Sequence, residues 1–175
     1  MRIDSVSRVH HPREAVYKAY RDNLPEIAAY IPDISKILVH KRADTAAGID
    51  LHNEWFADTE IPSVARKFIK PEHLRWDDHA TWNDEGHYVD WVIKTRVFTD
   101  SVTCSGRNTF IEDGPNSTQV QLQGSLTISV KAIPGVPSFV AKRMAPQIEA
   151  FIVKLITPNL EQVNRSIGAY LDARA

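Results

Sequence analysis

The chain has 175 residues, of which 43% are hydrophobic and 25% are charged, a mixture typical of globular proteins rather than disordered or fibrous ones. This length fits one domain over residues 1–175, in which about 70% of the unfolded surface would be buried. A formal net charge of -1 excludes the basic footprint that nucleic-acid-binding proteins carry. No apolar run approaches the roughly 18 residues that a membrane span needs.

The cysteine content and the first residues favour a reducing, cytoplasmic compartment. Cys104 is the single cysteine, so it has no partner for an internal disulfide. The opening residues Met1 to Asp4 mix polar and apolar side chains, which is unlike a signal peptide. We expect Cys104 to be a buried structural thiol on a strand.

The first part of the chain predicts one strand followed by two short helices. Ile3, Val6 and Val9 occur among polar residues in the expected strand, 2–10. Helical spacing of apolar residues, with Pro12 in the first turn, predicts a helix over 12–22.

A second helix is expected to follow directly, with Asn23 as its N-cap and Pro32 as its end.

The middle of the chain predicts an antiparallel meander. Its segments are rich in β-branched and aromatic residues and most are separated by turn-forming groups. The segments are 34–42, 49–58, 74–83, 87–98, 102–111 and 118–130. Apolar and polar residues alternate clearly in the last one, which indicates a sheet with one buried and one wet face.

The last segment, 137–172, predicts a long helix with a continuous apolar stripe. Pro146 and Pro158 each remove a backbone donor, so bends or breaks are expected there. The part from 137 to 156 alone would run about 30 Å, enough to cross a sheet of six or seven strands.

This order of elements resembles that of the START-like (SRPBCC) superfamily, which includes polyketide cyclases, birch-pollen-allergen-like proteins and lipid-transfer domains. The stretch from Ile61 to Trp76 is also similar to the central segment of some uncharacterised bacterial members, and distantly to PRELI-type phospholipid-transfer domains. The resemblance implies an α+β helix-grip fold, with a curved antiparallel sheet of six to seven strands around the C-terminal helix. It also implies a cavity for a hydrophobic or amphipathic small molecule between sheet and helix.

Alternation along the strands predicts which side chains face that helix. Asp78 shares its face with Trp76 and Trp82, and Asn53 and Asn108 also turn inward if no bulge reverses the alternation. Several tryptophans with a few polar groups are typical of a small-molecule pocket. The expected ligand-binding residues are Asn53, Trp55, Trp76, Asp78, Trp82, Trp91, Asn108, Phe110, Met144 and Phe151.

Plainer explanations remain open for the same residues. The tryptophans are also explained as core filling, and the polar residues as turned to solvent or bonded to backbone. An inward Asp78 must be paired, hydrated or protonated, because burying an unpaired carboxylate costs much free energy. Arg143 is the nearest candidate counter-ion, although a helix arginine is more often solvated.

No metal or cofactor is expected. The seven histidines have no metal-binding spacing, and His10 and His11 point apart on a strand. The sequence also has no nucleophile elbow, phosphate-binding glycine loop or dinucleotide fingerprint.

Residues 60–73 show helical spacing between two strands, which predicts either a lid over the cavity mouth or a surface helix at the sheet edge. Three basic residues there, Arg66, Lys67 and Lys70, would suit transient contact with an anionic head group or membrane surface.

The leading hypothesis is a noncatalytic binder or carrier of a hydrophobic small molecule, either a lipid or an aromatic compound. The alternative is an enzyme of the polyketide cyclase or dehydratase type, with Asp78 as acid or base aided by Asn108 or Asn53. A third possibility is a filled cavity in a protein that acts through its surface. Because no acid and base are placed together by the sequence, binding is favoured over catalysis. No feature indicates the oligomeric state.

Overall fold

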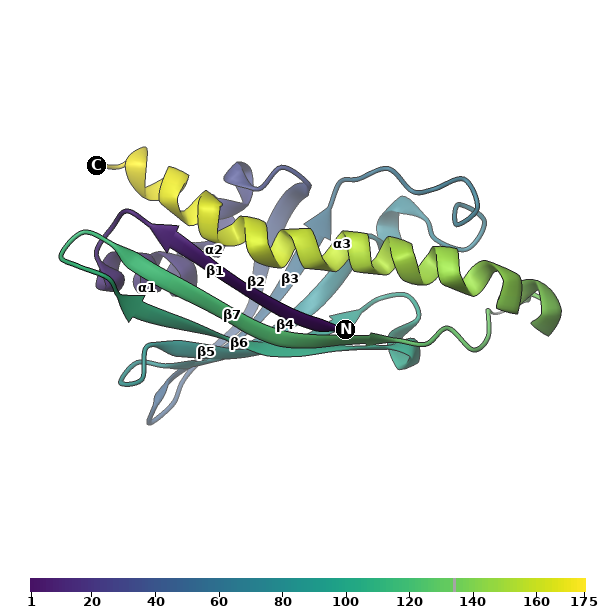
Figure 1. Cartoon of the computed structure of the whole chain (residues 1–175), viewed down its shortest axis with the longest axis horizontal. Coiled ribbons are helices and arrows are strands. Elements are labelled where there is room, and N and C mark those ends of the chain that lie inside the picture. The colour runs from purple at the N-terminus through teal and green to yellow at the C-terminus, as the bar shows by residue number, and fades with distance from the viewer. Residues whose placement is uncertain (134) are drawn as a thin grey trace.

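The structure is a computed structural model, and it describes residues 1–133 and 135–175. Seven antiparallel strands form one sheet in the order β1-β7-β6-β5-β4-β3-β2, and the long helix α3 runs along one face of it (Figure 1). The strands are β1 (Arg2–Val9), β2 (Ile34–Asp44), β3 (Gly48–Ala57), β4 (Arg75–Asn83), β5 (Tyr88–Thr95), β6 (Val102–Glu112) and β7 (Thr118–Ile128). The helices are α1 (Arg13–Asp22), α2 (Leu24–Ile27) and α3 (Ser138–Asp172). The expected helix-grip fold is confirmed, and every expected strand is present with differences only at its ends.

The junction of α1 and α2 differs from expectation in one detail. Asn23 makes no side-chain cap to α2, and its backbone carbonyl instead accepts hydrogen bonds from the amides of Glu26 and Ile27. The second position of α2 is Pro25, which has no N–H to donate to a capping side chain. After α2 a short 3-10 helix (Ala28–Tyr30) ends the helical segment before Pro32.

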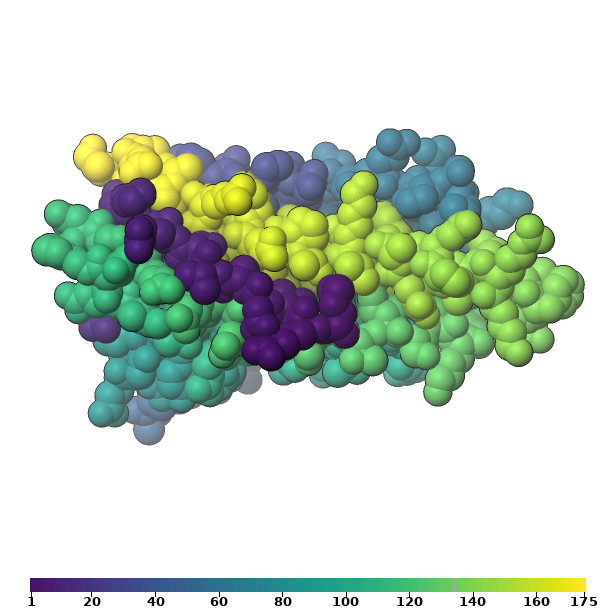
Figure 2. All heavy atoms as spheres, viewed as in Figure 1, coloured from purple at the N-terminus to yellow at the C-terminus, as the bar shows by residue number. Residues whose placement is uncertain are grey.

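Helix α3 is continuous through Pro146 and Pro158, so neither proline breaks it. Each proline costs about 3 kcal/mol in a helix interior. The apolar stripe offsets this cost, because a fully buried Ile or Val side chain contributes about 1.5–3 kcal/mol. Figure 2 shows β1 alongside the C-terminal half of α3. The buried members of the stripe include Ile148, Ile152, Ile156, Val163 and Ile167.

Residues 60–73 do not form the expected helix. The segment consists of consecutive turns followed by the 3-10 helix Pro71–His73. Two of its turns are closed by bonds from the Ala65 amide to Pro62 and from the Ile69 amide to Ala65. The spacing of apolar residues nevertheless identified side chains that pack inward, because Ile61, Ala65 and Ile69 are buried. A segment this short between two prolines gains too few hydrogen bonds to offset the cost of helix nucleation.

Two glycines make room for Trp91 on the inner face of the sheet. Gly106 of β6 and Gly124 of β7 are directly paired, and the Trp91 indole of β5 lies over both. A Cβ atom on Gly106 would lie 2.5 Å from the Trp91 ring, and one on Gly124 would lie 2.9 Å from it. Backbone oxygens are equally close, with the Gln123 carbonyl oxygen 2.5 Å from the first Cβ and the Ser105 carbonyl oxygen 2.8 Å from the second, so neither position accepts a side chain unless the indole and the backbone both shift.

We expect Gly106→Ala to lower the free energy of unfolding by about 1–3 kcal/mol, because the added methyl group overpacks the core against Trp91 and the Gln123 carbonyl. Adding Trp91→Phe should recover part of the loss. The control is Gly168→Ala in α3, where the nearest atom, Cγ1 of Val9, lies 3.7 Å from the added Cβ. That change should raise the free energy of unfolding by about 0.5–1 kcal/mol. Urea unfolding measures all three, and an unchanged Gly106→Ala protein would contradict the assigned contact.

Candidate ligand-binding site

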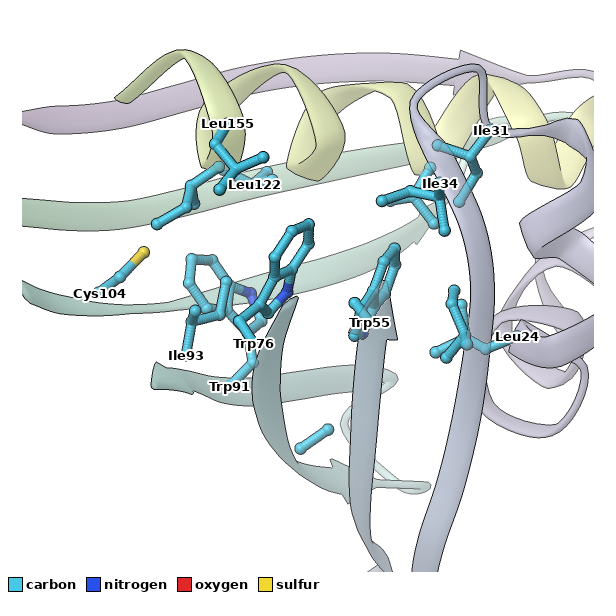
Figure 3. Close-up of a cluster of buried hydrophobic side chains, with 14 of the residues drawn as sticks. Leu24, Ile31, Ile34, Trp55, Trp76, Trp91, Ile93, Cys104, Leu122 and Leu155 are labelled. Carbon is cyan, nitrogen blue, oxygen red and sulfur yellow. The ribbon is translucent and has the colours of Figure 1, made fainter. Parts of the chain in front are cut away.

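A cavity lies between the inner face of β3, β4 and β5 and the C-terminal half of α3. Figure 3 shows Trp55, Trp76 and Trp91 projecting from these strands toward the helix, with Leu24 beside Trp55. The side chains around the cavity are mostly apolar and come from every layer of the fold. They are Tyr20, Leu24, Asn53, Trp55, Trp76, Asp78, Ala80, Trp82, Val89, Trp91, Ile93, Asn159, Leu160 and Val163.

The cavity is narrow. About 480 Å³ of space around it is not filled by atoms, but only about 20 Å³ is open to the centre of a water molecule. One water needs roughly 10–15 Å³ on the second measure. A ring-sized ligand therefore needs the surrounding side chains to move.

Asp78 carries the one carboxyl group among the lining residues, all of which belong to the described part of the chain. One oxygen, Oδ2, accepts hydrogen bonds of 3.3 Å from Nδ2 of Asn53 and of 3.3 Å from Nε1 of Trp55. Burial raises the pKa of Asp78 to about 6, against the two hydrogen bonds and the nearby His52, which act to lower it. The expected counter-ion, Arg143, is exposed to solvent on α3. Asp78 is therefore held by neutral donors.

Six of the ten expected ligand-binding residues line the cavity, namely Asn53, Trp55, Trp76, Asp78, Trp82 and Trp91. The other four do not line it. Met144 and Phe151 belong to the first half of α3, whereas the helix residues at the cavity are Asn159, Leu160 and Val163. The ligand-binding role of all ten remains a prediction.

Asn108 and Phe110 lie behind the cavity wall. Asn108 accepts a hydrogen bond of 3.0 Å from Nε1 of Trp91 and donates one of 3.3 Å to the Tyr20 hydroxyl. It therefore fixes two lining side chains. Phe110 packs against Tyr17, Tyr20 and Trp82, with ring centres 5.3–5.9 Å apart. This cluster closes the end of the sheet beneath α1.

The sequence reasoning missed several lining residues, and two of them carried a signal. Asn159 is a polar residue within the apolar stripe of α3, immediately after Pro158, and it is buried. Its side chain donates a 2.7 Å hydrogen bond to the Leu155 carbonyl. Tyr20 lies on the apolar face of α1, which packs against α3 and β6. Leu160 and Val163 had no signal beyond their place in the stripe.

A charged network on the opposite face of the sheet holds β3 and β4 together. Glu54 and Asp77 are directly paired across the two strands, and Arg96 donates to both, at 3.1 and 3.0 Å. His40 lies 2.6 Å from Glu54, and His52 lies 2.7 Å from Asp77. These contacts surround the strand segments that carry Asn53 and Asp78 on their inner side. Among the described residues, no group of three or more His, Cys, Asp or Glu side chains is placed to hold a metal ion.

The comparisons with known proteins concern the fold. No protein-family model and no curated protein matches the chain. The ZhuI aromatase/cyclase of Streptomyces sp. R1128 is 13% identical over 99% of this chain and 94% of its own, with a TM-score of 0.68. Norcoclaurine synthase of Thalictrum flavum, solved with dopamine and hydroxybenzaldehyde, is 12% identical over 100% of this chain and 88% of its own, with a TM-score of 0.62.

A START superfamily protein of Mycobacterium smegmatis is 12% identical over 93% of this chain and 98% of its own, with a TM-score of 0.52. At such identities the likeness shows the fold alone. The chain has the helix-grip fold of the START-like superfamily, as the order of its elements predicted. In the part of the chain that the structure describes, no helix is both long and apolar enough to cross a membrane.

The raised pKa of Asp78 predicts a specific dependence of stability on pH. In the unfolded chain its pKa is about 3.9, so between about pH 4 and pH 6 the folded protein binds more protons than the unfolded chain. The contribution of Asp78 to the free energy of unfolding should therefore fall by about 2 kcal/mol as pH rises from 4 to 6, and by less than about 0.5 kcal/mol above that. The Asp78→Asn variant should lack this fall.

Urea unfolding at intervals between pH 4 and pH 8 measures the effect as the difference between wild type and variant. Asp44→Asn, at an exposed position at the end of β2, is the control and should follow wild type. Parallel curves for wild type and Asp78→Asn would show that Asp78 titrates as it does in the unfolded chain.

Proposed function

We propose that this protein binds, and carries, a hydrophobic or amphipathic small molecule in the cavity between the sheet and α3. The supporting observation is the cavity itself, whose wall combines four tryptophans with Asn53 and Asp78. Aromatic walls with few polar groups are typical of small-molecule sites. The described residues around it contain no paired acid and base, which catalysis of proton transfer would normally use.

Proteins with similar structures support the same class of ligand. Norcoclaurine synthase was solved with two small aromatic molecules, and another similar structure is a polyketide aromatase/cyclase. The ligand of this chain is therefore proposed to be a lipid or an aromatic compound. The free Cys104 is buried, and the proposed place of action is the reducing cytoplasm.

Ligand binding should change the tryptophan emission, because all four tryptophans line the cavity. A panel of fatty acids, sterols, quinones and flavonoids is titrated, and at least one compound should give a saturable change. Ala80→Leu, which fills the cavity from β4, should weaken that binding by about tenfold or more. The control is Thr81→Leu, one residue further on the exposed face. Absence of any saturable change would instead favour a protein with a filled cavity, which the narrow space also allows.

An enzyme of the polyketide cyclase or dehydratase type is the second candidate. It is favoured by the partly buried position of Asp78 and by its pKa near 6, which would let this carboxyl exchange protons close to neutral pH. Asn53 contacts Asp78 directly, whereas Asn108 is bonded to Trp91 and Tyr20. Of the two asparagines proposed to assist, only Asn53 is thus in position.

The Asp78→Asn variant separates carrier from enzyme. In a carrier it should retain affinity within about fivefold, because a neutral amide still forms hydrogen bonds. In an enzyme it should bind substrate but lose turnover by about 100-fold or more. The two measurements are a fluorescence titration and a product assay by mass spectrometry on the ligand that copurifies with the protein. We expect the first result, and a 100-fold loss of turnover at unchanged affinity would contradict the carrier.

A transient membrane contact and a lid at residues 60–73 remain part of the proposal. No residue of this segment is among the side chains that line the cavity in the described chain. Arg66 donates to Glu60 at 2.9 Å and to the Ile61 carbonyl at 2.8 Å, so its charge is compensated within the segment. Lys67 and Lys70 are exposed and would face an anionic surface.

A further inference from the structure

Two buried acceptor atoms at the cavity have no donor. They are Oδ1 of Asn53 and Oδ1 of Asp78, and neither has a hydrogen-bond partner among residues 1–133 and 135–175. Asn53 and Asp78 are direct neighbours across the β3–β4 ladder, and Asn53 is fully buried. A buried polar atom without a partner costs about 1–3 kcal/mol, and more when it is charged. The pair is therefore poised to accept hydrogen bonds from a bound molecule.

The orientation of Asn53 follows from the charge of Asp78. An ionised carboxylate only accepts hydrogen bonds, so the NH2 group of Asn53 faces it, as the 3.3 Å contact from Nδ2 shows. The carbonyl end of Asn53 then faces away and is also an acceptor. Among the donors of the same wall, Trp55 already donates to Oδ2 of Asp78, while Nε1 of Trp82 and the Tyr20 hydroxyl donate to neither free oxygen. A bound molecule can therefore supply the missing donors.

The charges on the cavity wall disfavour the binding of an anionic ligand. The lining residues, all within the described chain, include no Lys, Arg or His. A ligand carboxylate at the same place would meet the Asp78 carboxylate in a low-dielectric site, and no positive side chain there would compensate the repulsion. A hydroxyl or amine group would instead donate to Asp78 and Asn53.

We propose that the cavity selects an apolar ring compound that carries a hydrogen-bond donor, either a hydroxyl or an amine group, and rejects the corresponding carboxylate. The inference rests on the proposed binding function and narrows its ligand class. Asp78 is the residue that rejects anions, and Asp78 together with Asn53 receives the donor. The rest of the wall contacts the ring.

The experiment compares four small ligands of matched shape, p-xylene, p-cresol, 4-methylbenzylamine and p-toluate, at about pH 7.5. Small rings are chosen because the cavity is narrow. Binding is followed by titrating the four tryptophan indole N–H signals in two-dimensional ¹⁵N–¹H NMR spectra, which Trp→Phe variants assign. We expect p-cresol or 4-methylbenzylamine to bind about fivefold or more tightly than p-xylene, and at least about tenfold more tightly than p-toluate.

The Asp78→Asn variant should keep its affinity for p-cresol within about fivefold, and the discrimination against p-toluate should shrink to about threefold or less. The matched control is Asp50→Asn, which changes an exposed carboxyl on the outer face of β3 and should leave the discrimination intact. A well-dispersed tryptophan spectrum of Asp78→Asn itself checks that β4 is folded.

Each of the other outcomes contradicts either the donor selection or the proposed binding function. If p-toluate binds as well as p-cresol, the donor selection is wrong while the cavity remains a binding site. If p-xylene binds as tightly as both donor ligands, water satisfies the two acceptors and the selection is again wrong. If none of the four ligands gives a saturable shift, the proposed binding function fails and the inference fails with it.

Discussion

The continuous pairing of β3 with β4 is the constraint on which the candidate site depends. The two strands pair without a register shift from Gly48 opposite Asn83 to Phe56 opposite Arg75. Successive side chains of an unbroken strand alternate between faces, so one ladder creates two different surfaces. Asn53 and Asp78 face the helix, while Glu54 and Asp77 face outward. A slip of one residue would exchange the two sets and turn the outer carboxylates toward the apolar helix, away from their arginine and histidine partners, which explains why the outer network and the cavity occur back to back.

This ladder also explains how far the sequence could predict the site. Alternation predicted the inner faces of β3 to β6 correctly, including the inward Asn53, Asp78 and Asn108, because these strands carry no bulge. The shifts occur in β2, between Ile34 and Lys36 and between Val39 and Lys41, where no site residue had been assigned. The sequence therefore predicted the sheet and its buried face well.

The same alternation could not predict where along a strand an inward side chain meets the cavity. Alternation says which face a side chain takes, but not which element covers it there. Asn108 and Phe110 have the expected inward direction, yet they lie where α1 closes the sheet. Met144 and Phe151 share the apolar stripe with Val163, and only the crossing point of α3 over the sheet decides which part of the stripe meets the cavity. That crossing point depends on tertiary packing, which no local pattern records.

The width of the cavity is set by aromatic packing. Trp55 and Trp76 stack with ring centres 5.9 Å apart, and Trp91 is held by Asn108 on one side and by the two glycines beneath it. Large flat side chains fill most of the space that the curved sheet creates, which leaves little more than the volume of a water molecule. Such a wall holds an apolar ring by contact area, but it has to separate before the ring enters.

The turn of α3 above the cavity is the part of the wall with the weakest backbone support. Pro158 has no N–H, so the Lys154 carbonyl lacks its usual partner in the helix, and one hydrogen bond of this turn is missing. Asn159 follows directly, and its side chain bonds to the Leu155 carbonyl of the same turn. The next residues, Leu160 and Val163, reach the cavity. Because a turn with an incomplete ladder costs less to displace than a complete one, widening the cavity here requires less energy than separating the fully paired strands β3 and β4 on the opposite side.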